Sequence, residues 1–124
     1  MSRTILLVDD SAVIRRSIRE CIERDSGWEV CGESENGKLA LEKVIQLCPD
    51  VVILDWQMPV MNGLETAKEI MRIAPSTTIL MITLHDSAEL ARNALAAGVK
   101  QVLSKSDRIA EHLIASLKDV AVAL

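Results

Sequence analysis

The stretch VVILD at residues 51–55 places a carboxylate, Asp55, directly after a wholly apolar run. Such a run is typical of a strand covered on both faces, as in a parallel sheet. Three other apolar runs also lead to polar side chains: residues 5–8 to Asp9 and Asp10, residues 79–82 to Thr83, and residues 102–103 to Lys105. If the four runs lie parallel in one sheet, these polar groups meet at its carboxyl edge, where open α/β sheets hold their sites.

Strand and helix patterns alternate along the whole chain. Strands are predicted at residues 4–8, 28–32, 51–54, 78–82 and 99–103. Helices with apolar residues at helical spacing follow each strand. Their predicted limits are Ser11 and Ser26-Gly27, Asn36-Gly37 and Cys48-Pro49, Asn62-Gly63 and Pro75, Ser87 and Gly98, and Ser106 or Asp107 to Val120. Five β-α units with right-handed crossovers imply an α/β fold with a doubly wound, five-stranded parallel sheet.

Length and composition exclude several classes of protein. A chain of 124 residues fits one domain over residues 1–124, and its net charge of −4 argues against direct binding of nucleic acid. No apolar run approaches the roughly 18 residues of a membrane span, and no signal peptide is visible. The three cysteines include no CxxC pair, which favours a reducing cytoplasm over disulfides or a zinc site and predicts small core residues.

The polar groups expected at the sheet edge suggest phosphoryl chemistry. Three carboxylates repel one another unless a cation joins them, and Lys105 alone does not balance their charge. A hard divalent metal would do so, and magnesium takes one or two carboxylates together with phosphate oxygens. Asp55 is the best candidate nucleophile because it follows a buried strand and precedes a loop held by Pro59 and Gly63. Phosphoryl transfer depends mainly on such positioning and on charge neutralisation.

Several motifs together resemble the receiver domain of two-component response regulators. They are LVDDS at residues 7–11, ILDWQMPVMNGL at residues 53–64, Ile82-Thr83, AGV at residues 97–99, and Lys105. The resemblance covers about residues 4–120 and implies a flavodoxin-like (βα)5 fold. It also implies an aspartate that receives a phosphoryl group from a histidine kinase or a histidine phosphotransfer protein. The spacing over residues 98–107 looks more like receivers attached to helix-turn-helix DNA-binding domains.

The resemblance implies a role for each polar residue, with magnesium as the metal and Asp55 as the phosphorylated residue. These roles are direct metal binding by Asp10 and Asp55, metal binding through water by Asp9 and through the main-chain carbonyl of Gln57, and contact with phosphoryl oxygens by Thr83 and Lys105. A receiver of this kind is a signalling switch rather than an enzyme, although it promotes its own phosphorylation and dephosphorylation. It is expected to form a homodimer when phosphorylated and to control transcription or a partner protein.

Two further positions are expected to modulate the site. His85, two residues after Thr83, is predicted to overhang the pocket and affect the access of water. Val102 stands where the resembling domains usually carry an aromatic residue that moves on activation, and this chain has no Tyr and no Phe. Because a β-branched side chain has essentially one torsion to choose, activation is predicted to be carried by the loop at residues 83–86 and the alanine-rich helix after it.

Other interpretations of the same residues remain open. A haloacid-dehalogenase-like phosphatase also uses a strand-end aspartate, but it usually has a second Asp where Gln57 stands, and it needs a cap domain. A flavin or nucleotide carrier would need a Gly-rich phosphate loop, which the sequence lacks. Arg15, Arg16 and Arg19 predict a basic patch on the first helix, either a solvated face or a contact for a kinase.

Overall fold

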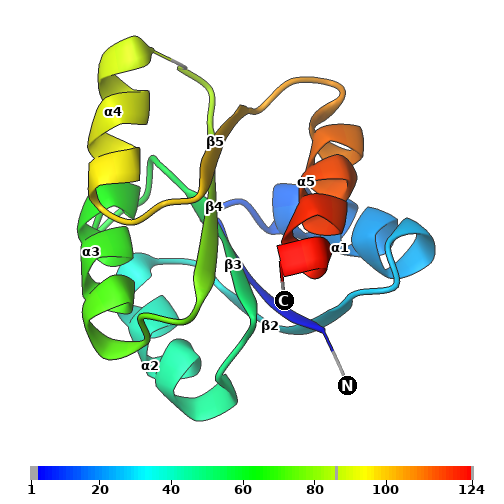
Figure 1. The fold of residues 1–124 in the computed structure, drawn as a ribbon, viewed down its shortest axis with the longest axis horizontal. Helices are drawn as coiled ribbons and strands as arrows, with labels where there is room; N and C mark the ends of the chain where they lie inside the picture. Colours follow the sequence, from blue (N-terminus) through cyan, green and yellow to red (C-terminus); the bar gives the residue numbers. More distant parts are fainter. Residues whose placement is uncertain (1–2, 86, 124) are drawn as a thin grey trace.

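The fold is a single parallel sheet with helices on both faces (Figure 1). The computed structural model describes residues 3–85 and 87–123. The sheet has five strands in the order β2-β1-β3-β4-β5, each parallel to its neighbours. The strands are β1 (Thr4–Val8), β2 (Glu29–Ser34), β3 (Val51–Asp55), β4 (Thr78–Thr83) and β5 (Gln101–Ser104). The predicted doubly wound, five-stranded architecture is therefore confirmed.

The helices form two layers, one on each face of the sheet. They are α1 (Ala12–Asp25), α2 (Gly37–Leu47), α3 (Gly63–Ile73), α4 (Ala88–Ala96) and α5 (Ile109–Ala123). In Figure 1, α1 and α5 lie on one side of the sheet, and α2, α3 and α4 lie on the other. Each face has its own hydrophobic cluster, which we call the α1/α5 core and the α2/α3/α4 core. Within the described residues, no helix is long and apolar enough to cross a membrane.

The apolar runs become the interior of the sheet because both of their faces are covered. Every residue of β3 is buried, and the same holds for β1 and β4 beyond their first residue. Four helices begin at a polar residue whose side chain accepts a hydrogen bond from the backbone N–H three residues later, which stabilises the first turn. These caps are Ser11, Asn36, Asn62 and Ser87. The predicted starts of these helices are thus confirmed.

Two strands and the cysteines differ from the sequence predictions. Trp28 is buried in the α1/α5 core ahead of β2, which runs later than predicted, over residues 29–34. β5 is also shorter than predicted, and Val99 packs in the α2/α3/α4 core before the strand begins. The prediction that all three cysteines are core residues is wrong, since Cys21 and Cys31 are half-buried and Cys48 is exposed. Cys48 is the C-cap of α2, in a left-handed conformation (φ 47°).

The strand order places a crevice at the carboxyl edge of the sheet. The chain passes from β1 outward to β2 and then returns across β1 to add β3 on the other side. Helices that follow β1 and β3 therefore leave the sheet on opposite faces and separate at their start. Ligands of open α/β sheets bind at such a reversal point, just beyond the strand ends. Asp9, Asp10 and Asp55 follow or end these two strands.

Candidate functional site

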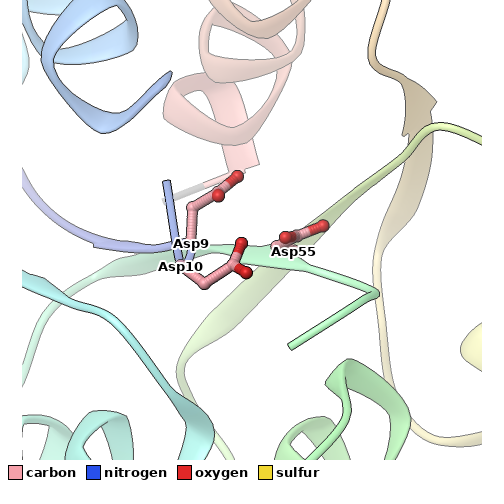
Figure 2. A group of neighbouring side chains, drawn as sticks. All are labelled: Asp9, Asp10 and Asp55. Carbon is pink, nitrogen blue, oxygen red and sulfur yellow. The ribbon is translucent and has the colours of Figure 1, made fainter. Parts of the chain in front are cut away.

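Three carboxylates converge at the reversal point. Asp9 and Asp10 follow β1 and Asp55 ends β3, and one carboxylate oxygen from each lies within 4.8 Å of the others. Figure 2 shows the three side chains grouped at the ends of these two strands. Asp9 and Asp55 are buried, at 2% and 3% exposure, whereas Asp10 is exposed. The structure thus brings together the three carboxylates that the sequence placed at one sheet edge.

Lys105, just past β5, bridges two of these carboxylates. Its Nζ lies 2.8 Å from Asp9 Oδ2 and 3.1 Å from Asp55 Oδ1. The Lys105 backbone N–H donates to the Thr83 carbonyl at 2.7 Å, which fixes the lysine to the end of β4. Burial acts to lower the pKa of Lys105, but the hydrogen bonds to Asp9 and Asp55 outweigh it and hold that pKa above its usual value. The lysine therefore stays charged throughout the neutral range.

The environment of Asp55 disfavours its charged form. Burial, and then repulsion by Asp9, raises the pKa of Asp55 from 3.8 to about 6, while hydrogen bonds from Lys105 and from the Gln57 backbone N–H act in the opposite direction. One ammonium thus does not balance three carboxylates. A carboxyl group with this pKa is mostly ionised at pH 7, and an added cation would stabilise its charge.

The site fits a hard divalent cation. Asp9 Oδ1 accepts a hydrogen bond from the Ser11 N–H at 2.9 Å. Asp9 Oδ2 is buried, and within the described chain no hydrogen bond of good geometry reaches it. The ammonium of Lys105 lies beside it as an ion pair. In front of it lies a pocket of about 260 Å³, lined by Asp10, Ile14, Asp55, Gln57, Leu84 and Lys105. We call this the acidic pocket. Its two carboxylates, the space for water and the unbalanced negative charge suit magnesium.

Thr83 and His85 lie on the other side of Asp55. Thr83 is buried at the end of β4, and its hydroxyl oxygen accepts a hydrogen bond from the His85 backbone N–H at 3.1 Å. The His85 side chain is exposed and lines a second cavity of about 270 Å³, together with Trp56 and the first turns of α4. Leu84 rather than His85 lines the acidic pocket. Leu84 could not be predicted at the pocket from the sequence, because nothing in its apolar side chain distinguishes it from a core residue.

A model of the response regulator receiver domain matches residues 5–118 of the chain. The chain belongs to this family. Its motifs at the ends of β1, β3 and β4 and at Lys105 are those on which the resemblance rested.

Known proteins with similar sequences and structures agree with this assignment. A protein-glutamate methylesterase/protein-glutamine glutaminase of Aliivibrio fischeri is 40% identical over the whole chain, which spans 32% of that protein's length. The chemotaxis protein CheY of Thermotoga maritima is 38% identical over 85% of this chain and 87% of its own. The response regulator domain of Thermotoga maritima CheB superposes with a TM-score of 0.90 at 29% identity, covering 97% of this chain and 96% of its own. These three relatives do not decide whether the chain resembles receivers attached to helix-turn-helix DNA-binding domains, so that similarity stays a prediction.

The backbone at Asp55 and directly after it is tightly packed. A Cβ on Gly63 would lie 2.5 Å from the Asp55 carbonyl oxygen and 2.8 Å from Trp56 Cα, so the first turn of α3 packs directly against the backbone of Asp55 and Trp56. The Trp56 carbonyl accepts from the Gly63 N–H, and the Trp56 N–H donates to Ile82, both at 2.9 Å. These contacts account for the glycine at this position of the motif and hold Asp55 in place.

Val102 lies on the face of the sheet that α4 covers. It is half-buried and packs against the α2/α3/α4 core. Of α4 itself, only Leu90 and Ala94 are buried. Asp86, which belongs to the loop predicted to carry the switch, lies outside the described residues.

Proposed function

We propose that this receiver accepts a phosphoryl group on Asp55 in a magnesium-dependent reaction and passes the signal on as a change of conformation. The observation that carries the proposal is the arrangement of Asp55: its buried carboxylate shares one pocket with a second carboxylate and with the ammonium of Lys105. This arrangement supplies a fixed nucleophile, a place for a cation and a positive charge for phosphoryl oxygens. The transfer of a phosphoryl group needs these parts and little else.

The reaction needs no proton transfer by the receiver. An Asp55 carboxylate oxygen forms a bond to phosphorus as the phosphorus–nitrogen bond of a donor phosphohistidine breaks, and the bond electrons leave with the imidazole. Lys105 already lies 3.1 Å from Asp55 Oδ1 and is placed to contact the transferred oxygens as a compact charge. The Thr83 oxygen accepts a hydrogen bond from His85 N–H, which leaves its own hydrogen for a phosphoryl oxygen.

Magnesium, when bound, neutralises charge on the phosphoryl oxygens and on the carboxylates. Asp10 and Asp55 line the acidic pocket and would hold the ion directly. Asp9 lies behind them, paired with Lys105, which suits contact through water. The main-chain carbonyl of Gln57 would complete the protein ligands.

The partners follow from the chemistry of the site. A histidine kinase or a histidine phosphotransfer protein would supply the phosphoryl group, and the phosphorylated receiver would pair with a second copy. Its surface for this would be α4, β5 and α5, or α1 and α5. The output is a partner protein or an attached domain: methylesterase relatives are about three times as long as this chain, and a role in transcription is a second possibility. The phosphatase alternative has no support, since the receiver family matches nearly the whole chain.

Mass spectrometry tests the proposal. Treatment with acetyl phosphate and magnesium should add one phosphate to the intact protein. The adduct should disappear in excess chelator and in Asp55→Asn, but persist in Asp107→Asn, which removes an exposed carboxylate near Lys105. An undiminished adduct in Asp55→Asn would show that the assignment is wrong.

A further inference from the structure

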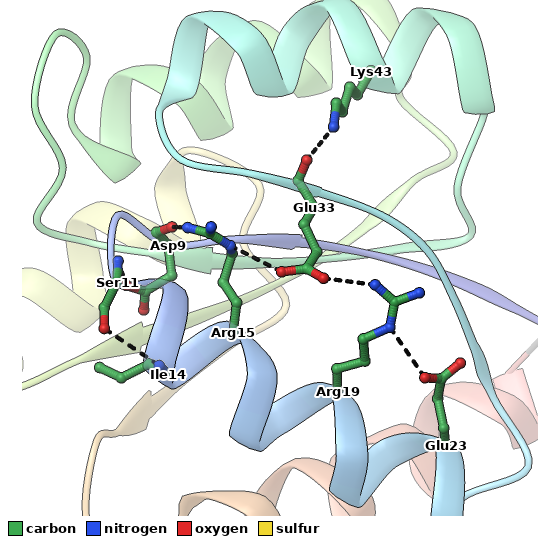
Figure 3. A network of polar contacts seen from close by, with 8 residues as sticks. All are labelled: Asp9, Ser11, Ile14, Arg15, Arg19, Glu23, Glu33 and Lys43. Carbon is green, nitrogen blue, oxygen red and sulfur yellow. Dashed lines mark hydrogen bonds and ion pairs between the residues drawn. The ribbon is translucent and has the colours of Figure 1, made fainter.

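The peptide unit that joins Asp9 to Asp10 has a contact outside the acidic pocket. The Arg15 guanidinium, one turn into α1, donates from Nη1 to the Asp9 carbonyl oxygen (Figure 3). That carbonyl belongs to the planar unit linking two of the three carboxylates. The orientation of this plane helps to determine where both side chains point, so a contact that fixes the carbonyl also fixes the relative placement of Asp9 and Asp10.

Arg15 is itself held firmly by β2. Its Nε donates to Glu33 Oε1 at 2.9 Å, and the arginine side chain is 16% exposed. The other Glu33 oxygen accepts from Arg19 Nη1 at 2.6 Å, and the Glu33 carbonyl accepts from the ammonium of Lys43 on α2. Burial acts to raise the pKa of Glu33, but hydrogen bonds from Arg19 and Arg15 hold it below its usual range. The glutamate therefore stays charged and anchors the guanidinium.

The remaining polar atoms of Asp9 are also held. Its backbone N–H donates to the Ser34 carbonyl of β2 at 3.1 Å, and its two carboxylate oxygens contact Ser11 and Lys105. The Arg15 contact therefore completes a set that holds Asp9 through its N–H, its carbonyl and both side-chain oxygens. Two of these contacts, one direct and one through Arg15, attach Asp9 to β2.

We propose that Arg15, anchored by Glu33, is a positioning residue that holds the Asp9–Asp10 peptide in the orientation that binds the cation. The inference rests on the proposed function, because it assumes that the acidic pocket binds magnesium. Of the arginines predicted to form a basic patch on α1, Arg16 is solvated and pairs with Glu20, whereas Arg15 turns toward the site. Partners that orient metal-binding groups from outside typically contribute about 10- to 100-fold to metal affinity.

A positioning role and a simple charge effect predict opposite results. Arg15→Gln removes a positive charge close to the pocket, which by charge alone would strengthen the binding of magnesium. If Arg15 positions the peptide, the same change should weaken binding by about tenfold or more. Arg15→Lys keeps the charge, but one ammonium cannot reproduce a fork that reaches both the carbonyl and Glu33. We therefore expect this variant to bind magnesium more weakly than wild type as well, with a smaller loss.

The measurement is magnesium affinity, by calorimetry and by Trp56 fluorescence, in wild type, Arg15→Gln, Arg15→Lys and Arg16→Gln. Arg16→Gln is the matched control, since it removes the same charge from an exposed side chain one residue away and should bind like wild type. Circular dichroism of each variant separates misfolding from lost affinity. At low magnesium, the two Arg15 variants should be phosphorylated by acetyl phosphate more slowly than wild type. At saturating magnesium, their rates should return to the wild-type value.

Each outcome separates the two proposals. If wild type binds no magnesium, the proposed function fails. If wild type binds magnesium and the folded Arg15→Lys matches it, or Arg15→Gln binds more tightly, the positioning role is refuted and the proposed function stands. The double variant Arg15→Gln, Glu33→Gln adds a check: because both residues act through one contact, its loss should be close to that of Arg15→Gln alone.

Discussion

Replacement of Asp55 by asparagine should make the metal-free protein more stable at neutral pH. The pKa of Asp55 is raised from 3.8 to about 6, chiefly by burial and by the charge of Asp9. At about 1.4 kcal/mol per pKa unit, this difference corresponds to roughly 3 kcal/mol against the charged form. The acidic pocket opens to solvent, which screens the repulsion, so we expect Asp55→Asn to raise the free energy of unfolding by roughly 1–2 kcal/mol at pH 7.

The sign of the pH dependence follows from proton binding. Between pH 3.8 and about 6 the folded protein holds a proton on Asp55 that the unfolded chain has lost. Stability therefore falls as pH rises through this window and stays low above it. Asparagine resembles the protonated carboxyl group at every pH. The advantage of Asp55→Asn should accordingly be full at pH 7 and disappear near pH 4.

Urea unfolding in the presence of a chelator, followed by circular dichroism from pH 4 to pH 8, measures this advantage directly. Asp107→Asn is the control, because an exposed carboxylate should change the free energy of unfolding by less than about 0.5 kcal/mol. Magnesium should then stabilise wild type more than Asp55→Asn. A variant that is less stable than wild type at pH 7, or whose advantage is the same at pH 4 and pH 7, would refute the electrostatic account of the site.

Three further predictions concern the region around the pocket. Trp56 adjoins Asp55, so its fluorescence should change on addition of magnesium and again with beryllofluoride. Trp28, in the opposite core, should stay silent, and a full response in Trp56→Phe would contradict this. Val60 has a left-handed backbone (φ 72°) that β-branched residues disfavour, so Val60→Asn should raise the unfolding free energy by about 1 kcal/mol in urea titrations. Amide exchange with beryllofluoride should change mainly over residues 83–98, and Thr83→Ala should remove the change; unaltered exchange there would refute a switch in this region.

The parts of this fold that sequence predicts are those determined by local chemistry. A run without polar residues, as at residues 51–54, can be stable only where both faces are covered. Asn36 and Asn62 cap helices because their side chains satisfy a backbone N–H that the first turn leaves unpaired. Once the strands are parallel, the carboxylates at their ends lie on one edge of the sheet, and the motifs shared with receiver domains predicted that Asp55 lies near Asp10.

Contacts that depend on packing could not be predicted in the same way. β2 carries an irregularity opposite Ile5 and Leu6, where Cys31 is the extra residue. The placement of Glu33 beside Arg15 depends on the register after this point and on how α1 packs against the strand. Trp28 likewise lies in a core whose position is defined by α1 and α5, and its burial has no local sign in the sequence. Such contacts require knowledge of which elements become neighbours.

Lys105 connects the chemistry of the acidic pocket to α4, the helix that we expect to move. In the unphosphorylated receiver its ammonium is shared between Asp9 and Asp55, and its backbone N–H is bonded to the Thr83 carbonyl. A phosphoryl group on Asp55 would compete with Asp9 for the ammonium, and its oxygens would attract the Thr83 hydroxyl from the neighbouring strand. These attractions act at the ends of β4 and β5, and the end of β4 leads directly into the loop before α4. Since α4 buries only Leu90 and Ala94, we expect it to shift at low cost and to pass the signal on without a moving aromatic at Val102.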